Sequence, residues 1–315
     1  MRLGVLDVGS NTVHLVAVDA RNGGHPTPMS DWKTSLRLVE LINDDGAIDE
    51  RGVKKLSKAV GEAAELAGTL GCSEIMPFAT SAVRSAANSD EVLDRVEEET
   101  GVRLRILSGA DEARLTFLAV RRWYGWSAGR ITNLDIGGGS LELSTGSDEE
   151  PDVAVSLDLG AGRLTHRWFD TDPPARKKVN LLRDYIDAEL ADATRQMRAF
   201  GPAGLAVGTS KTFRTLARLT GAAPSSEGPY VKRTLTAPGL RQLIAFITRM
   251  TAADRAELEG ISSDRSHQIV AGALVAEASM RALGLEKLEI CPWALREGVI
   301  LRRIDTGLPQ ERTQS

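Results

Sequence analysis

One short pattern occurs twice in the chain, once near the start of each half, and it limits the folds that the chain can adopt. Residues 6–13 read LDVGSNTV and residues 134–141 read LDIGGGSL. In both copies an apolar run typical of a strand ends at an aspartate, a glycine turn follows, and a second apolar run resumes. Two β-hairpins of the same design, so far apart in the chain, predict two related α/β domains.

The residues of both turns suit the binding of a phosphate-like anion. Glycine lets the backbone adopt positive φ and approach a ligand closely, so successive N–H groups can form a nest for an anion. Asp7 and Asp135, which precede the turns, cannot bind phosphate directly but can hold Mg²⁺ or its water shell. Two ordinary hairpins are the alternative, and the match between the copies, one with three consecutive glycines, favours phosphate binding.

Hydrophobic periodicity divides the rest of the chain into alternating strands and helices, with loops over 20–34 and 221–235. Strands are expected at 3–7, 12–19, 36–41, 74–79, 103–107, 131–135, 141–145, 153–159, 205–207 and 286–291. Helices are expected at 52–69, 80–87, 90–99, 109–123, 161–168, 177–199, 209–220, 238–250, 252–258, 265–283 and 294–304.

The glycine-containing segment at 125–129 marks the expected domain break. We expect a first domain over 1–125 and a second over 126–293. The last helix, about 294–306, can pack back on the first domain, and residues 307–315 form a polar tail that we expect to be frayed.

Composition excludes several classes of protein. A net charge of −4 and an aromatic content of 4% argue against a basic, base-stacking surface for nucleic acid. No apolar stretch reaches the roughly 18 residues of a membrane helix, and the start MRLGVLDVGSN turns polar too early for a signal peptide. Cys72 and Cys291 cannot make a disulfide framework. We therefore expect a cytoplasmic protein without nucleic-acid or membrane partners.

Five blocks together resemble a known family. They are DVGSN at 7–11, ATSAVRSAAN at 79–88, SGADEARL at 108–115, DIGGGSLE at 135–142 and ALREGVI at 294–300. The two turns look like the phosphate loops of the acetate and sugar kinase, Hsp70 and actin superfamily. All five blocks in this order resemble the exopolyphosphatase and guanosine pentaphosphate phosphohydrolase family, over roughly residues 1–304. The length resembles the short, two-domain members, and the arginine-rich sequence resembles an actinobacterial form.

The resemblance implies an α/β fold of two ribonuclease-H-like (actin-like ATPase) domains, with mixed sheets flanked by helices and an active site in the interdomain cleft. It implies release of terminal orthophosphate from inorganic polyphosphate with Mg²⁺ or another divalent cation, and a homodimer.

Other functions stay open at this point. Some members of the family remove the 5′ γ-phosphate of guanosine pentaphosphate, an activity of the stringent response. A small-molecule kinase on the same fold would need an adenosine loop, and no convincing one is present. A non-catalytic sensor of an alarmone or of phosphate is a third alternative, against which the acidic, arginine and glycine blocks argue.

Within the resemblance, Glu112 takes the position of the family's catalytic glutamate. A carboxylate there would orient the water that attacks the terminal phosphate. Taken without the resemblance, acidic residues in a first helical turn are commonly present for the helix dipole, and that alternative stays open. Asp111 departs from the family's usual glutamate, and we expect little consequence because the catalytic role maps to the next residue.

The resemblance also indicates phosphate-binding residues. Arg84 lies in a small, hydroxyl-rich segment and could clamp phosphate oxygens bidentately, with an ordinary surface arginine as the alternative. Residues 208–214 follow a short strand and open a helix, whose N-terminus attracts anions. The full expected set is Gly9, Ser10, Asn11, Arg84, Gly137, Gly138, Gly139, Ser140, Ser210 and Lys211.

Asp135 and Glu142 are the expected metal ligands, with Asp7 sharing the metal through water. A lone glutamate within a strand is disfavoured, and an exposed strand face is the alternative explanation for Glu142. One departure from the family lies close to these sites. The usual Ser-Gly-Thr reads SKT at 210–212, so a cation replaces a glycine at a phosphate loop.

Overall fold

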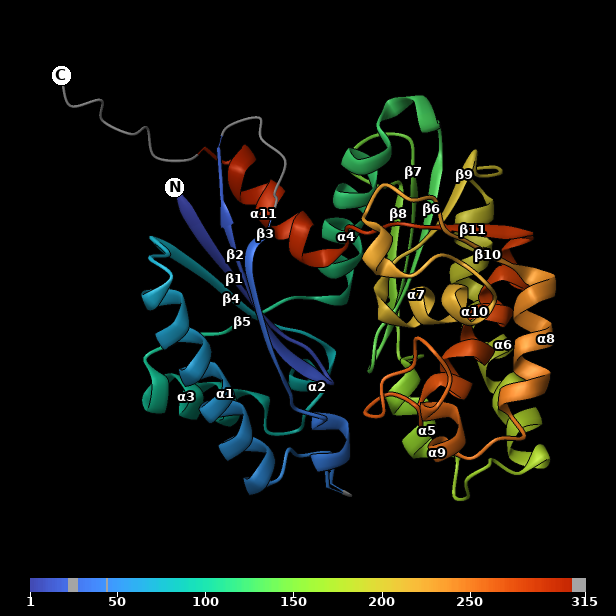
Figure 1. Cartoon of the computed structure of the whole chain (residues 1–315), viewed down its shortest axis with the longest axis horizontal. Helices are drawn as coiled ribbons and strands as arrows, with labels where there is room; N and C mark the ends of the chain where they lie inside the picture. The colour runs from blue at the N-terminus through green and yellow to red at the C-terminus, as the bar shows by residue number, and fades with distance from the viewer. Residues whose placement is uncertain (22–27, 44, 308–315) are drawn as a thin grey trace. The chain divides into compact units, whose positions relative to one another are not determined.

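The computed structural model describes residues 1–21, 28–43 and 45–307, and these form two compact units that are described separately (Figure 1). Unit 1 comprises Met1–Ser108 and the C-terminal helix that begins at Leu295, and unit 2 comprises Gly109–Ala294. Each unit holds a mixed β-sheet with helices packed against it, which confirms the predicted α/β class. The tail expected at 307–315 lies, beyond Gly307, outside the described residues.

The sheet of unit 1 has the strand order β3-β2-β1-β4-β5. Its strands are β1 (Arg2–Val8), β2 (Thr12–Asp19), β3 (Pro28–Ser35), β4 (Glu74–Ala79) and β5 (Arg105–Ile106). β1 pairs antiparallel with β2, as does β2 with β3, whereas β4 lies parallel to β1 and β5 parallel to β4. The register of the first hairpin places Asp7 opposite His14.

The helical segments that the structure describes in unit 1 are η1 (Leu38–Leu41), α1 (Glu50–Thr69), α2 (Ser81–Arg84), α3 (Ser89–Thr100) and α11 (Leu295–Asp305). α1 begins after the N-cap Asp49, whose carboxylate accepts a hydrogen bond from Gly52 N (2.8 Å). The apolar residues of α1 that face the core lie three or four positions apart: Val53, Leu56, Val60, Ala63 and Ala67.

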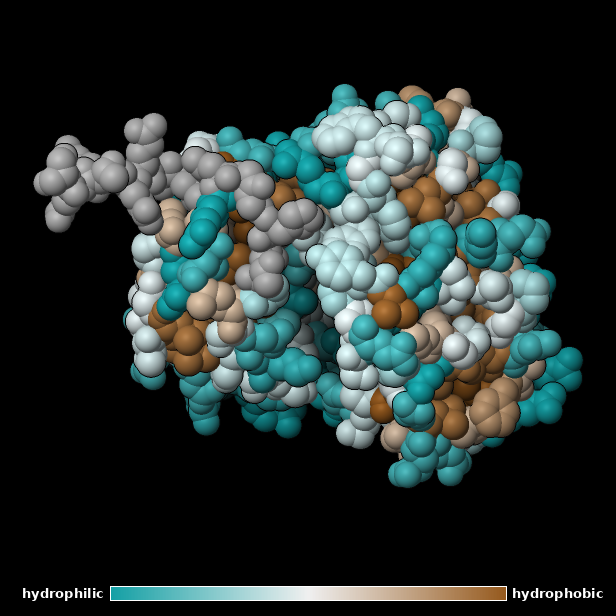
Figure 2. All heavy atoms as spheres, turned by 45° about the horizontal axis from the view of Figure 1, so that its top comes forward, coloured by the Kyte–Doolittle hydropathy of each residue, from teal (hydrophilic) through white to brown (hydrophobic). Residues whose placement is uncertain are grey.

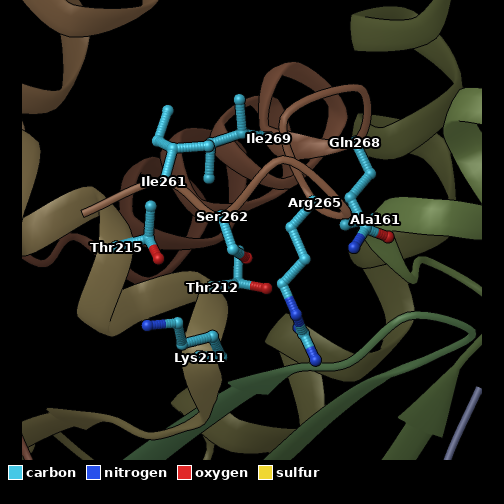
Figure 3. Close-up of a pocket in the computed structure, with 9 residues that line it drawn as sticks. All are labelled: Ala161, Lys211, Thr212, Thr215, Ile261, Ser262, Arg265, Gln268 and Ile269. Carbon is cyan, nitrogen blue, oxygen red and sulfur yellow. The ribbon is translucent and has the colours of Figure 1, made fainter. Parts of the chain in front are cut away.

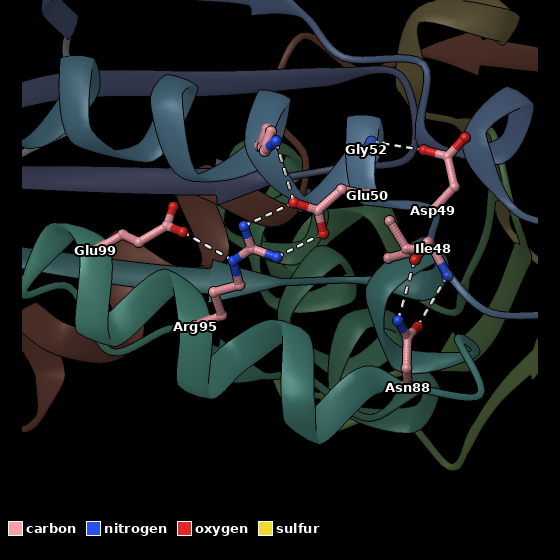
Figure 4. Close-up of polar contacts among 8 residues, drawn as sticks. Ile48, Asp49, Glu50, Gly52, Asn88, Arg95 and Glu99 are labelled. Carbon is pink, nitrogen blue, oxygen red and sulfur yellow. Dashed lines mark hydrogen bonds and ion pairs between the residues drawn. The ribbon is translucent and has the colours of Figure 1, made fainter.

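Polar contacts join α1 to α3 and to the segment before α1 (Figure 4). Arg95 of α3 binds Glu50 of α1 through two nitrogens (2.6 and 2.9 Å) and also Glu99 one turn along α3 (2.8 Å). Asn88 precedes α3 without capping it, and its amide instead exchanges two hydrogen bonds with the backbone of Ile48 (2.9 and 3.0 Å). Asn88 therefore has a structural role in unit 1.

The sheet of unit 2 has the order β10-β11-β9-β6-β7-β8. Its strands are β6 (Ile131–Ile136), β7 (Leu141–Gly146), β8 (Val153–Leu157), β9 (Leu205–Gly208), β10 (Thr234–Thr236) and β11 (Lys287–Ile290). β6, β7 and β8 are antiparallel neighbours, β9 lies parallel to β6, and β11 lies parallel to β9. The arrangement of unit 1 is therefore repeated, with β10 added antiparallel at the far edge.

The helices of unit 2 are α4 (Gly109–Tyr124), η2 (Trp126–Ala128), α5 (Ala161–Trp168), α6 (Arg176–Arg198), α7 (Ser210–Leu219), η3 (Ser225–Glu227), α8 (Ala237–Ile247), α9 (Ala252–Ala256) and α10 (Ile269–Leu283). α10 lies at the centre of the core, because residues 269–280 are all buried and α5, α6, α7 and α8 pack around them. Its apolar surface is therefore used inside the unit.

Three parts of the predicted strand pattern are wrong. The strand expected at 36–41 is instead η1, and β3 lies within the loop expected at 20–34, of which residues 22–27 are outside the described residues. β3 was missed because it has no buried residue and begins with Pro28, as edge strands often do. β10 lies in the loop expected at 221–235 and has only three residues, too few to show a period.

The division into units at Ser108 and Gly109 differs from the expected break at 125–129. The physical reason is the packing of α4, whose residues lie against β7 and β8 of unit 2. α11 groups with unit 1, where it packs against β1.

The surface is mostly polar on the face drawn in Figure 2, where hydrophilic residues lie between smaller hydrophobic areas. Within the described ranges, no helix combines the length and the apolar character that crossing a membrane requires. Both cysteines, Cys72 and Cys291, are free thiols.

Candidate active site

The glycine turn of unit 2 joins β6 to β7. Gly137 N donates to Ser140 O (2.9 Å), which closes the turn. The three glycine carbonyls accept hydrogen bonds from the start of α5: from Ala161 N (3.0 Å), from Arg163 N (2.9 Å) and from Arg163 Nε (2.9 Å). The N–H groups of residues 138–140 have no acceptor among the described residues. One side of the turn is thus occupied by carbonyl contacts, and its amides form a nest for an anion.

This turn needs glycines on both of the segments that meet there. A Cβ on Gly160 would overlap the backbone of Gly139, and a Cβ on Gly162 would lie 3.1 Å from Gly138 O. By contrast, Gly137 does not use positive φ, so the left-handed conformation expected of it is absent. The sequence analysis missed the role of Gly160 and Gly162, although a glycine at the N-cap and another in the first turn of a helix are a signal of close backbone packing.

Two carboxylates face each other at the end of the second hairpin. Asp135 pairs with Glu142 in the register of β6 and β7, and Glu142 is only 5% exposed. Ser156 Oγ donates to Glu142 Oε1 (2.8 Å), and Thr209 Oγ1 donates to Asp135 Oδ2 (2.7 Å). Burial raises the pKa of Glu142 well above its usual value, and the nearby charges of Glu112 and Asp135 raise it further.

Glu112 joins this pair from the first turn of α4. Its side chain is buried, with 6% exposure, and its charge acts on Glu142. The preceding residue, Asp111, is partly exposed and pairs with Arg114 on the surface (3.6 Å). The structure therefore brings together the expected catalytic glutamate and the two expected metal ligands of unit 2. Asp111, by contrast, lies at the surface.

The oxygen donors of this cluster fit a hard divalent cation. Among the described residues, no three His, Cys, Asp or Glu side chains form a complete set of metal ligands. Mg²⁺ does not need one, because it keeps several waters and is usually bound through one or two carboxylates. The raised pKa of Glu142 reflects carboxylates gathered in a buried place, and a cation would relieve that repulsion. Asp135 and Glu142 therefore fit Mg²⁺ as a pair.

The glycine turn of unit 1 repeats the backbone arrangement. Gly9 N donates to Thr12 O (2.9 Å). The carbonyl of Ser10 accepts from Leu38 N (2.8 Å), and that of Asn11 accepts from the backbone at 36–37 (2.8 and 3.1 Å). Within the described part of the chain, the N–H groups of Ser10 and Asn11 have no acceptor. Unit 1 therefore presents a second open amide nest.

Asp7 ends β1 beside this turn and is half-buried. Its pKa is raised to about 6, mainly by burial; on α11, Arg296 opposes the rise and Glu297 adds to it. Its partner in the hairpin is His14, so the carboxylate pair of unit 2 has no counterpart here.

A Thr-Ser pair follows the fourth strand of each unit, and the sequence analysis did not recognise that these pairs match. Thr80 N donates to Val8 O (3.1 Å) after β4, and Thr209 N donates to Leu134 O (2.9 Å) after β9. The serine that follows opens a helix in both units, and in unit 1 Ser81 Oγ lies 3.0 Å from Ser10 Oγ. Alignment of ATS at 79–81 with GTS at 208–210 was the available signal.

The remaining expected phosphate ligands lie at helix ends. Arg84, the last residue of α2, donates from Nη1 to Leu107 O (2.8 Å), which anchors its half-buried side chain. Ser210 begins α7 with φ of 68°, in the left-handed region that non-glycine residues rarely adopt. Lys211 follows with an exposed side chain on the first turn of α7. The backbone strain at this loop is thus at Ser210 and not at the position where the lysine replaces a glycine.

Close relatives in sequence are exopolyphosphatases. A profile of the Ppx/GppA phosphatase family matches residues 17–306. Exopolyphosphatase 1 of Mycobacterium leprae (strain TN) is 68% identical over 306 residues, which cover 97% of this chain and 90% of the relative. Exopolyphosphatase 1 of Mycobacterium tuberculosis (strain ATCC 25618 / H37Rv) is also 68% identical over 306 residues, with 97% and 89% covered.

Solved structures of more distant proteins share the fold. The crystal structure of an exopolyphosphatase from Cytophaga hutchinsonii has a TM-score of 0.88 at 24% identity and covers 97% of this chain and 98% of that chain. The Aquifex aeolicus member of the Ppx/GppA family has a TM-score of 0.79 at 22% identity, covering 98% and 99%. This likeness confirms the predicted fold class.

Proposed function

This chain belongs to the Ppx/GppA phosphatase family, and from that premise we propose that it is an exopolyphosphatase, a phosphoanhydride hydrolase that releases terminal orthophosphate from inorganic polyphosphate. The observation that carries the proposal is the pair of open amide nests at 10–11 and 138–140, one in each unit. An amide nest recognises the oxygens of a polyanion, and the second nest lies at the end of a hairpin whose strands carry a carboxylate pair.

The reaction is a transfer of the terminal phosphoryl group to water. The water oxygen forms a bond to the terminal phosphorus, the bond from that phosphorus to the bridging oxygen breaks, and the shortened chain leaves with that oxygen. Glu112 orients the water and accepts its proton, for which a carboxylate in a buried position beside the nest is suited. Orthophosphate and a polyphosphate one unit shorter are the products.

Asp135 and Glu142 would hold Mg²⁺, with Asp7 contributing through water. When bound, the ion supplies positive charge to the phosphoryl oxygens, which is the main electrostatic requirement of phosphoryl transfer. Thr209 keeps one oxygen of Asp135 oriented (2.7 Å), and Ser156 does the same for Glu142 (2.8 Å). Such outer hydrogen bonds hold metal ligands in place, and their loss typically weakens metal affinity by about tenfold or more.

Each unit offers its own donors for phosphate groups. Unit 1 provides Gly9, Ser10, Asn11 and Arg84, and unit 2 provides Gly137, Gly138, Gly139, Ser140, Ser210 and Lys211. The support is local: nests with open amides, a guanidinium anchored by Leu107 O, and the N-terminus of α7.

Location and assembly are part of the same proposal. We place the protein in the cytoplasm, which agrees with its two free thiols and with the absence of any membrane-crossing helix among the described residues.

We also propose a homodimer. Since α10 is buried within unit 2, its apolar surface does not provide the contact between copies.

The test is phosphate release, measured in parallel from short polyphosphate, long polyphosphate, guanosine pentaphosphate and ATP. With Mg²⁺ we expect release from polyphosphate, and none when a chelator removes the metal. If neither polyphosphate were hydrolysed, the proposed function would be rejected. Full activity in chelator would reject the proposed requirement for Mg²⁺. Preferential release from guanosine pentaphosphate would assign the chain to the stringent-response activity of the family instead.

A further inference from the structure

Buried polar atoms without a hydrogen-bond partner occur in more than one setting in unit 2. Gln268 Oε1 is one such atom, and it belongs to the lining of a pocket between α7 and residues 261–269, whose space of about 280 Å³ includes solvent at its mouth (Figure 3). Lys211 and Arg265 line the same pocket. Asn133 lies instead on β6 inside the sheet, where it is 0% exposed, and neither atom of its amide group has a partner among the described residues. Buried amides are almost always satisfied in folded proteins, so Asn133 needs a partner from within the unit.

The hairpin of β6 and β7 places Asn133 beside the expected metal ligands. Residues two apart on a strand share a face of the sheet, so Asn133 lies on the face of Asp135, and Ser144 lies on the face of Glu142. The register pairs Asp135 with Glu142 next to the glycine turn, and it pairs Asn133 with Ser144 one step farther from that turn. An amide and a hydroxyl therefore lie directly behind the carboxylate pair, on the side away from the turn.

Ser144 is as enclosed as Asn133. It is also 0% exposed, and its Oγ has no partner among the described residues. α4 covers this face of the hairpin, because Phe117 lies against Gly146 of β7 and packs in one apolar cluster with Ile131 of β6. The two polar side chains thus lie between the carboxylates and an apolar part of the core.

A water molecule is the group that can satisfy both side chains. Asn133 offers two N–H donors and an acceptor oxygen, and Ser144 offers a hydroxyl. Buried waters in proteins typically form about three hydrogen bonds to groups of this kind. The next polar groups along this face are the carboxylates of Asp135 and Glu142, which can accept the hydrogen bonds that such a water donates.

The hydrogen bonds already described hold these carboxylates from the neighbouring strands. Thr209 Oγ1 donates to Asp135 from the end of β9 (2.7 Å), and Ser156 Oγ donates to Glu142 from β8 (2.8 Å). A water held by β6 and β7 themselves would orient the carboxylates from a third direction. Outer hydrogen bonds of this kind keep metal ligands in place.

We propose that Asn133 and Ser144 bind a buried water behind the carboxylate pair, and that Asn133 is thereby a positioning residue for Asp135 and Glu142. The inference rests on the proposed function, because it takes these two carboxylates as the ligands of Mg²⁺. Carboxylates that are already oriented bind the ion at a lower cost, so Asn133 acts on metal affinity and not on affinity for polyphosphate.

The test is binding of Mn²⁺, which suits the same oxygen ligands as Mg²⁺, to the full chain without substrate, with electron paramagnetic resonance of the free ion as the measurement. Asn133→Val and Asn133→Thr form a matched pair, because their new side chains have nearly the same shape and only threonine can bond a water. We expect Asn133→Val to weaken Mn²⁺ binding by about tenfold. The Mg²⁺ concentration for half-maximal hydrolysis should rise by a similar factor, with KM for polyphosphate unchanged. Asn133→Thr should keep most of the affinity.

The opposite face of the same hairpin provides the control. Thr132 and Thr145 form the neighbouring cross-strand pair and are buried, and their hydroxyls are hydrogen-bonded to each other (3.1 Å). Because strand residues alternate between faces, this pair lies on the face away from Asp135 and Glu142. Thr132→Val therefore removes a buried hydroxyl from β6 without altering the proposed water site, and we expect Mn²⁺ affinity to stay the same.

Stability distinguishes a positioning role from a merely structural one. The double variant Asn133→Val/Ser144→Ala replaces both polar partners by apolar groups, which is often neutral or stabilising for folding. We therefore expect an unchanged or higher midpoint of urea unfolding together with weaker Mn²⁺ binding. A lower midpoint with unchanged Mn²⁺ affinity, equal affinities of Asn133→Val and Asn133→Thr, or the same loss in Thr132→Val would overturn the proposal. So would a lack of Mn²⁺ binding by the original chain.

A crystal structure of the original chain tests the water directly. We expect an ordered water within hydrogen-bond distance of Asn133 and of Asp135 or Glu142, and a direct bond between Asn133 and Ser144 in its place would overturn the proposal. Hydrolysis of polyphosphate by the original chain separates this inference from the proposed function. Hydrolysis with Mn²⁺ binding that is insensitive to Asn133 would reject only the inference, whereas Mn²⁺ binding that depends on Asn133 without hydrolysis would reject only the function.

Discussion

In unit 1, Asp7 lies opposite His14 across the first hairpin, whereas in unit 2 Asp135 lies opposite Glu142. His14 Nε2 lies 2.8 Å from Asp31 Oδ1, so the histidine is engaged with an acidic residue of the next strand. Glu142 instead shares its surroundings with two further carboxylates. The same backbone hairpin therefore places an aspartate opposite a histidine in unit 1 and gathers several carboxylates in unit 2.

The difference shows how two units with the same fold can have different roles in one reaction. In both units the carbonyls of the turn are held by a segment from elsewhere in the unit, residues 36–38 in one and the start of α5 in the other, and the amides remain open. Binding of phosphate oxygens needs only this backbone. Only unit 2 adds Glu112, Asp135 and Glu142, so the chemistry of metal and water is expected to depend mainly on unit 2.

The largest expected effect is on the catalytic carboxylate of unit 2. Glu112→Gln keeps the shape of this buried side chain but removes its ability to accept a proton, so we expect kcat to fall by about 10²-fold or more. Release of orthophosphate from polyphosphate measures it. Asp111→Asn is the control, since that side chain pairs with Arg114 on the surface and should keep near-normal turnover. Near-normal turnover of Glu112→Gln would remove Glu112 from the mechanism.

The next effect concerns how closely the unit 2 turn is packed. Gly160→Ala introduces a Cβ that overlaps the backbone of Gly139, so we expect a loss of about 2 kcal/mol in the free energy of unfolding together with weaker polyphosphate binding. Gly68→Ala in α1 of unit 1 is the control, because its Cβ meets nothing within 4 Å. That variant should be neutral or slightly more stable. Equal stability of both variants would contradict the close approach of α5 to the turn.

Much of this comparison could be predicted from the sequence. The two hairpins were visible because each turn interrupts an apolar run after an aspartate, and antiparallel register then places Glu142 opposite Asp135. α1 was visible because its buried residues recur every three or four positions. These features depend on local periodicity, which a single sequence contains.

Other features depend on tertiary packing and could not be predicted in the same way. The sequence places Glu112 in a first helical turn, where the helix dipole is a sufficient explanation; its burial beside Glu142 follows from the packing of α4 on β7 and β8. The bond from Thr209 to Asp135 joins residues 74 positions apart. Likewise, Arg265 and Lys211 line one pocket only because α7 packs beside α10.

Metal dependence should distinguish the two aspartates. Asp135→Asn removes a charge beside Glu142 but can still accept the hydrogen bond from Thr209, so we expect the Mg²⁺ concentration for half-maximal activity to rise by about tenfold. Asp7→Asn should raise it less, because Asp7 is expected to act through water. Titration of activity with Mg²⁺ in both variants gives the comparison. A larger effect of Asp7→Asn would place the metal with unit 1 and break the proposed division between the units.

The smallest effect is on the pH dependence of folding in unit 1. Burial raises the pKa of Asp7 to about 6, whereas an aspartate in an unfolded chain has a pKa of about 3.9. Well below pH 4 the group is protonated in both states and has no effect. As the pH rises toward 6 the unfolded chain loses its proton first, so the folded state becomes progressively less favoured, with the full cost above pH 6. In chelator, Asp7→Asn should therefore gain about 1 kcal/mol of stability relative to the original chain between pH 4 and pH 7.5, allowing for partial exposure of this carboxylate.

Asp19, at the other end of the same hairpin, is the matched control because its titration has the opposite sign. The hydrogen bond from Arg2 lowers the pKa of Asp19, so its ionised form favours the folded state, and this contribution is lost as the pH falls through the pKa. Asp19→Asn should thus lose stability relative to the original chain as the pH rises toward 4, and it should change little between pH 4 and pH 7.5, where Asp7→Asn gains stability. Urea unfolding at both pH values measures the two differences. If Asp7→Asn gained no more stability between these pH values than Asp19→Asn, burial of Asp7 would not explain its pKa, and the environment assigned to the unit 1 carboxylate would be wrong.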